Sequence, residues 1–407
     1  MGRRVVITGA GTVNPLAHDV AGTLAALAEG RCAIGPLDLP DLGRLAIRIG
    51  AQVRGWEVAG RFPAPEAALM DRATAFAVAA AEQAVAQAWL RLSGAEALRA
   101  GAILGTAGGG FATAEDGYRA VFAQGRDRVH PFTVPRLMHN APVAHLSMRF
   151  GLKGPSFTVA TACAASNHAI GLAAQAIRSG AADVMLAGGS EAMLTFGGIK
   201  AWEGLRVLSP DGCRPFCASR SGLVLGEGAA VFVLEAEDRA RARGAPVLAE
   251  IAGFGMTADA GDIVLPSAEG AARAMRLALE DAGMAPGEVG YINAHGTATR
   301  ANDRAEAAAI HAVFGAQAPA IAVSSTKSMH GHLIGAAGAV ELLACLMALG
   351  EGVIAPTAGF RAADPDCALD VVPNRARRAE VAAALSNAFA FGGLNAVLAL
   401  RRADGGG

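Results

Sequence analysis

The chain has 407 residues, a net charge of −1 at pH 7, and a hydrophobic fraction of 53% against a charged fraction of 17%. This balance predicts one large, well-buried α/β body without an overall basic field, which argues against nucleic acid as a partner. The longest apolar helix expected, at 334–349, contains Glu341 and is shorter than the roughly 20 residues that cross a bilayer, so no membrane span is expected. Six cysteines in so long a chain, with no secretory signal at its start, indicate reduced thiols and a cytoplasmic location.

The N-terminal part begins with a predicted strand that runs into glycines. Residues 5–8 are followed by Gly9 and Gly11, as at the start of a dinucleotide-binding unit, but Asn14 occupies the place of a third glycine. A tight turn is therefore the favoured interpretation. Further on we expect an irregular surface segment, a helix, a strand ending in glycines and a proline-containing loop, at 31–68, 70–92, 101–106 and 129–145.

A short strand and a long helix enclose the cysteine around which the chain is organised. Residues 157–160 are apolar, and 164–179 have the length and composition of a buried helix, so Cys163 falls at the turn between them. The positive end of the helix dipole lowers the pKa of a thiol there, as a nucleophile requires. A buried structural cysteine is the alternative, because free cysteines are among the most buried residue types.

The second half of the chain repeats this order of elements. We expect a helix, a strand ending before His295, and then a strand, a turn and a helix, at 271–282, 289–293, 321–326, 327–331 and 332–349. This order places Lys327 and His332 where the first half has Cys163. We therefore predict two related halves, 1–250 with Cys163 and 251–407 with His295, Lys327 and His332, whose sites meet at a pseudo-twofold axis.

Four separated motifs, in the same order along nearly the whole chain, carry a resemblance to a known family. They are Thr161-Ala162-Cys163-Ala164-Ala165-Ser166, His295-Gly296-Thr297-Ala298-Thr299, Lys327-Ser328-Met329-His330-Gly331-His332 and Phe391-Gly392-Gly393-Leu394-Asn395. With them the chain resembles the β-ketoacyl-acyl carrier protein synthases of the synthase II type, and within that type the nodulation-type branch. The resemblance implies a thiolase fold, in which two βαβαβαββ halves stack into a five-layered αβαβα sandwich that normally forms a homodimer.

The resemblance also implies a reaction and its catalytic residues. Cys163 would take the acyl group as a thioester, because a thiolate is both a strong nucleophile and a good leaving group. His295 and His332 would donate hydrogen bonds to the enolate that forms when a malonyl-carrier thioester loses CO2. Decarboxylative Claisen condensation would then extend a fatty acyl or related chain by two carbons, and an acyl carrier protein would present both substrates.

Further residues have supporting roles in the resembled family. Lys327 would hold the surrounding electrostatics, and Glu341 would support the site from the following helix. The backbone amides of Cys163 and Phe391 would form the oxyanion hole, and Phe391 would also gate the acyl pocket. Ala390 stands where the family has a glycine, which predicts a stiffer gate loop.

No metal and no cofactor are expected. His330, His332 and His295 are possible ligands, but residues two apart at a helix start point in different directions, and no carboxylate is near in sequence. We expect His330 to be a variable loop residue. Cys213 and Cys217 have no second pair or neighbouring histidine to complete a zinc site.

Two small residues mark the expected acyl pocket. Housekeeping members of the resembled family have large apolar residues at the positions of Gly108 and Thr133, so a wider tunnel for long or kinked chains is expected here. The alternative is that a neighbouring aromatic residue, Phe111, Phe132 or Phe196, refills the space.

The carrier protein is expected to dock on a local basic patch. Arg206 matches the docking position of the resembled family, Arg126 and Arg128 lie close to another, and Arg72 is a further candidate. Helical carriers are acidic, and a nearly neutral chain must meet them with such a patch.

Two other functions compete with the condensing enzyme. A thiolase would need a second cysteine late in the chain, and Cys367 lies in a proline-containing loop that suits it poorly. A catalytically silent partner subunit of a polyketide-type heterodimer would normally lack the nucleophile. Intact Cys163, His295 and His332 argue against the silent subunit.

Overall fold

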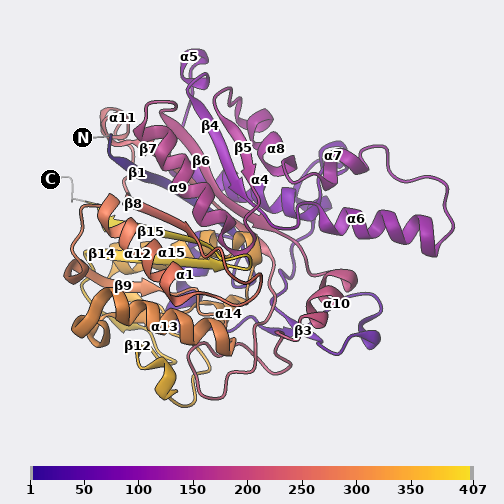
Figure 1. Ribbon diagram of the computed structural model, residues 1–407. Helices are drawn as coiled ribbons and strands as arrows, with labels where there is room; N and C mark the ends of the chain where they lie inside the picture. Colours follow the sequence, from indigo (N-terminus) through magenta and orange to yellow (C-terminus); the bar gives the residue numbers. More distant parts are fainter. Residues whose placement is uncertain (1–2, 404–407) are drawn as a thin grey trace.

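The computed structural model describes residues 3–403, in which eleven strands form one sheet (Figure 1). Within it the first half contributes the strands β5-β4-β6-β7-β1 and the second half contributes β8-β15-β14-β9-β10, with β12 at the far edge. The strand bounds are β1 Val5–Val13, β4 Ala100–Gly105, β5 Ser156–Val159, β6 Val184–Glu191, β7 Gly228–Ala236, β8 Ala249–Ala258, β9 Val289–Asn293, β10 Ala322–Ser324, β12 Asp370–Val371, β14 Ala383–Ala390 and β15 Leu394–Arg402.

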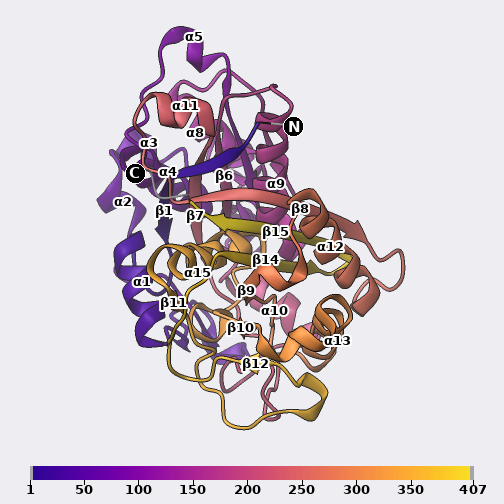
Figure 2. The ribbon, with the colours of Figure 1, turned by 90° about the vertical axis from the view of Figure 1, so that its left-hand side faces the viewer.

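The two halves have the same topology. In each half the five strands follow the order third, second, fourth, fifth, first, and the fifth strand runs antiparallel to both of its neighbours. The remaining pairs are parallel, and the halves join where β1 pairs antiparallel with β8. Most of the first half lies above the second in both views (Figures 1 and 2). The predicted duplication is therefore present in the sheet itself.

Helices make up the other layers. The central helices α9 and α15 each pack against strands of both halves and against each other, whereas α4 and α8 cover the outer face of the first half and α12 and α13 that of the second. This is the five-layered thiolase fold that the resemblance predicts. The helix bounds are α1 Val20–Glu29, α4 Arg72–Gln87, α6 Phe111–Tyr118, α7 Thr133–Leu137, α8 Ala141–Phe150, α9 Ala165–Arg178, α10 Phe196–Gly204, α11 Glu237–Ala242, α12 Ala268–Asp281, α13 Arg300–Phe314, α14 Lys327–His330 and α15 Ala337–Glu351.

Glycines in the first strand of each half let a helix approach closely. In β1, a Cβ would lie 2.1 Å from a carbonyl oxygen of α4 at Gly9 and 1.9 Å from one at Gly11. In β8, a Cβ would lie 2.2 Å from a carbonyl oxygen of α12 at Gly253 and 2.1 Å from one at Gly255. Real Cβ atoms do not approach so closely, so these positions require glycine. The glycines after residue 8 thus serve helix–sheet packing at equivalent places in both halves.

The segment 129–145, expected as a loop, contains α7 and the start of α8. Pro135 and Pro142 lie in the first turns of these helices, where a missing N–H breaks no hydrogen bond of the helix. The segment 31–68 is largely irregular, as expected, and holds the short elements β2 Gly35–Pro36, β3 Ile49–Gly50, α2 Val58–Arg61 and α3 Ala64–Ala67. The remaining short elements are α5 Gly94–Ala97, β11 Val353–Ile354 and β13 Arg377–Arg378.

One helical stretch of the described chain, Ile334–Glu351, is long and apolar enough to cross a membrane by length and composition. It lies mostly buried between the two halves, and Glu341 within it is buried as well. Its apolar character is therefore that of a core helix.

Candidate active site

Cys163 lies at a sharp turn between β5 and α9. It is the middle residue of the 3-10 turn Ala162–Ala164, and Ala162 has a φ of 46°, a left-handed conformation that costs energy for a residue with a side chain. The second half repeats this turn as Ile334–Ala336 before α15, and Ile334 also has a φ of 46°. Gly335 therefore corresponds to Cys163, whereas the sequence pattern suggested Lys327 and His332.

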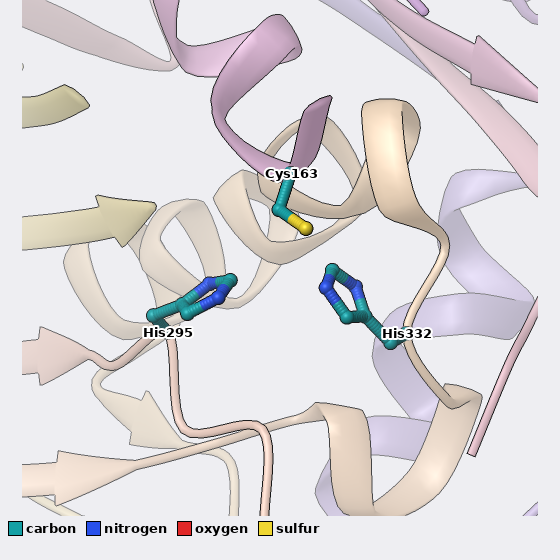
Figure 3. Close-up of side chains that lie close together, drawn as sticks. All are labelled: Cys163, His295 and His332. Carbon is teal, nitrogen blue, oxygen red and sulfur yellow. The ribbon is translucent and has the colours of Figure 1, made fainter. Parts of the chain in front are cut away.

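Cys163, His295 and His332 converge from three separate elements. Cys163 comes from the turn before α9, His295 from the loop after β9, and His332 from the loop after α14 (Figure 3). The Cys163 Sγ and one ring nitrogen of each histidine all lie within 4.8 Å of one another, and the two imidazole rings meet edge to face at a centroid distance of 5.4 Å. One reacting group can therefore contact all three side chains.

His332 is held as a neutral hydrogen-bond donor. Its Nδ1 accepts a hydrogen bond of 3.2 Å from the backbone N–H of Ile334, so the proton of the neutral ring resides on Nε2. Burial, followed by the charge of Lys327, lowers its pKa well below the usual value. Nε2 is buried and has no partner among the described residues. A buried donor without a partner is costly, and an incoming substrate oxygen would satisfy it.

His295 has the same protonation for a different reason. The Nζ of Lys327 lies 3.5 Å from His295 Nδ1 and donates a hydrogen bond of 2.6 Å to the His295 carbonyl oxygen. Since an ammonium can only donate, Nδ1 is an acceptor and the proton of the ring is on Nε2. Burial and then the Lys327 charge lower the pKa of His295 well below its usual value. Both imidazoles are therefore neutral donors.

Lys327 and Glu341 form a buried ion pair beside the two histidines. Lys327 Nζ donates to Glu341 Oε1, and both side chains are almost completely buried. The second carboxylate oxygen of Glu341 has no partner within residues 3–403. The ammonium thus has a fixed position, from which its charge adds to the effect of burial in lowering the pKa values of His295 and His332.

The pKa of the Cys163 thiol differs from the sequence prediction. Burial raises it to about 12, although the charge of Lys327 and the backbone N–H of Cys163 act in the opposite direction. The predicted lowering by the helix dipole is therefore outweighed by desolvation. Burial thus favours the protonated thiol over the thiolate in the resting protein.

Alkylation of Cys163 by iodoacetamide is expected to be slow at pH 7 and to accelerate about tenfold per pH unit up to pH 10, because the thiolate is the reactive form. Peptide mapping with mass spectrometry at each pH measures this rate. Lys327→Met should slow the reaction further at pH 9, since the ammonium favours the thiolate. A rate that levels off below pH 8 would show that the thiol pKa is low after all.

Acidic residues of α13 hold the His295 loop, and sequence reasoning did not identify them. Glu306 accepts hydrogen bonds from the backbone N–H of His295 at 2.8 Å and of Gly296 at 2.7 Å. Asp303 accepts from the backbone N–H of Phe216 at 2.7 Å and of Ala298 at 3.2 Å. The sequence did contain a signal for these residues. Asp303 and Glu306 lie three residues apart on a helix that directly follows the His295 motif, so they share one face of that helix.

A pocket of about 100 Å³ opens onto the three converging side chains. Phe391 lines its mouth, and its ring stacks on Trp202 with centroids 5.8 Å apart. The loop segment Val264, Leu265 and Pro266 forms another wall. Phe391 thus lines the pocket, while its role as a gate and the role of its amide in an oxyanion hole stay predictions.

The structure does not bring Gly108 and Thr133 to this pocket. A Cβ on Gly108 would lie 2.8 Å from two atoms of the Met193 side chain, so the space expected beside Gly108 is already filled. The residue that refills it is Met193, which was not among the aromatic residues considered. Thr133 lies at the start of α7 and lines a separate pocket with Arg126 and Arg128.

The predicted docking arginines differ in their surroundings. Arg206 is exposed, and it precedes Val207, which lines the pocket of Cys163. Arg126 and Arg128 are exposed in the loop after α6, which projects from the body (Figure 1). Among residues 3–403, none of these three forms an ion pair, whereas Arg72 is held in a partly buried pair with Glu227 at 2.9 Å. Arg72 already has a carboxylate partner, and its part in docking stays a prediction.

His330 is buried and does not belong to a variable loop. Its Nε2 lies 2.9 Å from Thr326 Oγ1 and its Nδ1 lies 2.8 Å from the Gly331 carbonyl oxygen, and burial lowers its pKa to about 3. His330 is fully buried with both ring nitrogens in contact with the protein, and it does not line the pocket of Cys163.

A metal ion is a possible occupant of the site by ligand type. Within the described chain, Cys163, His295 and His332 form the one group of cysteine, histidine and acidic side chains close enough to hold an ion. A dication there would meet the Lys327 ammonium, which lies 3.5 Å from His295 Nδ1, and this repulsion disfavours it. The absence of a metal stays a prediction that elemental analysis can check.

The fold and the site together define a thiolase-fold acyltransferase. The sequence matches the models of the β-ketoacyl synthase N-terminal domain over residues 2–240 and of the C-terminal domain over residues 248–361. The chain belongs to the β-ketoacyl synthase family.

Three similar proteins refine this assignment. The chain is 50% identical to nodulation protein E of Rhizobium sp. (strain N33), covering 99% of this chain and 100% of that protein. It is 39% identical to 3-oxoacyl-[acyl-carrier-protein] synthase 2 of Staphylococcus aureus (strain N315), covering 98% of each. It also superimposes with a TM-score of 0.91, at 31% identity over 99% of this chain and 100% of the other, on a ketosynthase solved in complex with its type II polyketide-synthase acyl carrier protein.

These similarities establish a condensing enzyme and confirm the predicted resemblance to synthase II and the nodulation-type branch. A silent partner subunit is not favoured, because Cys163, His295 and His332 are all present and converge. The thiolase alternative also lacks support. Cys163 is the only cysteine of the described chain that lines the pocket, and Cys367 packs within a separate apolar cluster.

Proposed function

We propose that the protein extends carrier-bound acyl chains by two carbons, with Cys163, His295 and His332 as its catalytic residues. The observation that carries this proposal is the convergence of one thiol and two neutral imidazoles, with Sγ and one nitrogen of each ring within 4.8 Å of one another. A nucleophile and two neutral donors are what acyl transfer followed by decarboxylative condensation requires.

In the first step the Cys163 sulfur attacks the carbonyl carbon of an acyl-carrier thioester. A new thioester bond forms on Sγ, the bond to the carrier sulfur breaks, and the carrier leaves as a thiol with the proton that Cys163 loses. Burial raises the pKa of Cys163, so attack and proton loss are coupled. The resulting acyl-enzyme is uncharged and suits the buried site.

In the second step a malonyl-carrier thioester loses CO2, and the electrons of the broken C–C bond form an enolate. His295 and His332 donate hydrogen bonds through Nε2–H to the enolate oxygen, and burial together with the charge of Lys327 keeps both rings neutral. The enolate carbon attacks the acyl group on Cys163. A new C–C bond forms, the bond from the acyl carbon to Sγ breaks, and the Cys163 thiolate that leaves takes up a proton from solvent.

The proposed function is tested by following the acyl group from the carrier to the protein and then to the product. Incubation with an acyl-carrier thioester should increase the mass of the protein by one acyl group, which peptide mapping places on Cys163. Addition of a malonyl-carrier thioester should then release a 3-oxoacyl product that is two carbons longer. If the protein never takes up an acyl group from any carrier thioester, the proposal is wrong.

The acidic carrier protein is proposed to dock beside the pocket mouth at Arg206, with Arg126 and Arg128 as further contacts. Arg206→Glu is expected to raise KM for the carrier substrate roughly tenfold at low salt, because charge reversal at an interface rim weakens charge steering. Arg91→Glu, a charge reversal at an exposed arginine beyond the end of α4, is the matched control. An unchanged KM for Arg206→Glu, or an equal rise for the control, contradicts this docking site.

A homodimer is proposed through the free edge of the sheet. Strand β5 is the outermost strand of the first half, and Phe157 on it is 45% exposed. Among residues 3–403 it pairs with β4 alone. An unpaired apolar edge is a template for a second copy of the same strand. Light scattering should give the mass of a dimer, and Phe157→Lys should shift it to a monomer. Leu277→Lys on α12 is the control, and a monomeric wild type would contradict the dimer.

A further inference from the structure

A buried carboxylate lies at the end of β6. Glu191 is the last residue of that strand, and its side chain is completely buried. All the groups that donate hydrogen bonds to it within residues 3–403 are uncharged, three of them backbone N–H groups and one a hydroxyl. A buried carboxylate is costly unless its oxygens accept such bonds. Glu191 therefore depends on these contacts, and the donating groups are held in place in turn.

The donors to Glu191 come from both halves of the molecule. Its Oε1 accepts from the Gly108 N–H at 3.1 Å and from the Thr106 hydroxyl at 3.3 Å. Its Oε2 accepts from the Ala107 N–H at 2.7 Å and from the Gly335 N–H at 3.1 Å. The first three donors follow β4 of the first half, whereas Gly335 lies in the turn before α15 of the second half. One carboxylate thus ties that turn to the first half.

The same turn carries the hydrogen bond that sets the proton of the His332 ring. The Ile334 N–H donates to His332 Nδ1 at 3.2 Å, and the next N–H along the chain, that of Gly335, donates to Glu191. Ile334 has a left-handed φ of 46°. A residue with a side chain keeps such a conformation only where the surrounding contacts impose it. The hydrogen bond from Gly335 to Glu191 is such a contact, one residue away.

The packing around Gly335 makes this contact direct. A Cβ on Gly335 would lie 2.5 Å from the Ala107 nitrogen and 2.7 Å from Glu191 Oε2, which is closer than real Cβ atoms approach. The turn therefore lies against both the carboxylate and the loop after β4. A change in the length or the chemistry of the Glu191 side chain acts on the turn without an intermediate group.

The duplication of the fold gives this contact a counterpart at the nucleophile. β6 and β14 are the fourth strands of their halves, and β14 contacts the Cys163 turn as β6 contacts the Gly335 turn. Ala390, the last residue of β14, packs against the cluster that contains Cys163. Each fourth strand thus ends against the turn of the opposite half. One of these turns presents the nucleophile, and the other directly follows His332.

We propose that Glu191 is a positioning residue for His332. By holding the Gly335 N–H, it keeps the neighbouring Ile334 N–H on His332 Nδ1, so that the ring proton stays on Nε2. Glu191 acts only through this turn, since it does not line the pocket of Cys163. The inference rests on the proposed function, because His332 is used as a donor in the decarboxylation step and not in the acylation step.

The first experiment measures the His332 ring by ¹⁵N NMR of protein labelled with [¹⁵N]histidine, with His332→Ala to assign its signals. The wild type should show one neutral form with the proton on Nε2. Glu191→Met has a side chain of similar length whose sulfur is only a weak acceptor, so the Gly335 contact is lost. A second neutral form, with the proton on Nδ1, should then appear. This readout does not depend on catalysis.

The second experiment compares the two steps of the reaction. Decarboxylation is measured in the Cys163→Gln background, and acylation of Cys163 is measured by intact-protein mass spectrometry in the wild-type background. Glu191→Met should slow decarboxylation about 10²-fold, the loss that follows from misplacing a catalytic group by about 1 Å. Acylation should stay nearly unchanged, because it does not use His332. A merely structural role of Glu191 would slow both steps alike.

Glu191→Gln is the conservative variant that should restore activity. Its amide oxygen can accept the Gly335 N–H while its NH2 group donates to the Thr106 hydroxyl. It should therefore recover about tenfold of the decarboxylation rate lost in Glu191→Met, the worth of one hydrogen bond to a buried group. If Glu191→Met does not fold, Glu191→Asp replaces it with the same expected direction, because its shorter side chain withdraws from Gly335.

Thr106→Val is the matched control. It removes one donor to Glu191 and leaves the Gly335 contact in place, so the ratio of the decarboxylation rate to the acylation rate should equal that of the wild type.

A wild-type His332 spectrum in Glu191→Met, or an equal fall of decarboxylation and acylation, would overturn the positioning role. Failure of the proposed function gives a different result. In that case no acyl group appears on Cys163 of the wild-type protein, while the NMR spectra still decide whether Glu191 sets the proton of His332.

Discussion

Replacing Cys163 with glutamine is expected to lower condensation by about 10⁴-fold or more while malonyl-carrier decarboxylation continues. Glutamine cannot form the thioester, and losses of this size accompany removal of a catalytic nucleophile. The enolate donors are separate groups on His295 and His332, which the substitution does not touch. Decarboxylation is measured as released CO2 and condensation as the 3-oxoacyl product.

Two further variants serve as controls for the decarboxylation and condensation steps. Adding His332→Ala to Cys163→Gln should also abolish decarboxylation, because a free Nε2–H donor is lost. Cys213→Ala, at a buried cysteine that does not line the pocket, should leave both steps intact. Loss of decarboxylation in Cys163→Gln alone would mean that the histidines need the thiol, and the separation of roles proposed above would be wrong.

Glu341→Leu is expected to destabilise the protein by about 3–5 kcal/mol. The substitution leaves the Lys327 ammonium fully buried without its carboxylate partner, and an uncompensated buried charge has a cost of this order. Urea unfolding followed by circular dichroism measures the free energy of unfolding. The decarboxylation rate should fall as well, since Lys327 would lose its fixed position beside His295.

The double variant Lys327→Met/Glu341→Leu separates stability from activity. With both charges replaced by apolar groups of similar size, most of the lost stability should return, because no charge remains buried. Activity should not return, since no ammonium remains to hold the His295 carbonyl oxygen and to face His295 Nδ1. If Glu341→Leu is as stable as the wild type, the pair is not the buried, unhydrated ion pair described above.

The sequence contained enough to predict the fold and the central residues. Periodicity placed the strand before Cys163, the helix after it, and the repeated order of elements in the second half. The four motifs supplied the family and the five-layered arrangement. These features are encoded locally, since hydrophobic spacing and turn residues act over a few neighbouring positions.

Other features depended on contacts between distant segments. Met193 beside Gly108, Glu306 beneath His295, and Trp202 stacked on Phe391 each join residues separated by more than ten positions. Sequence reasoning placed extra space at Gly108, because a missing side chain is visible in the sequence, whereas the residue that occupies its place is not. The burial of His330 was not visible in the sequence either.

The sequence by itself determined the family, the duplicated fold and the identity of the thiol and two histidines. Only the tertiary structure decided their chemical state. Desolvation raises the pKa of Cys163 to about 12, and burial together with Lys327 keeps both histidines neutral. These effects depend on the distance between groups and on the exclusion of water around them, and neither quantity is defined until both halves have packed together.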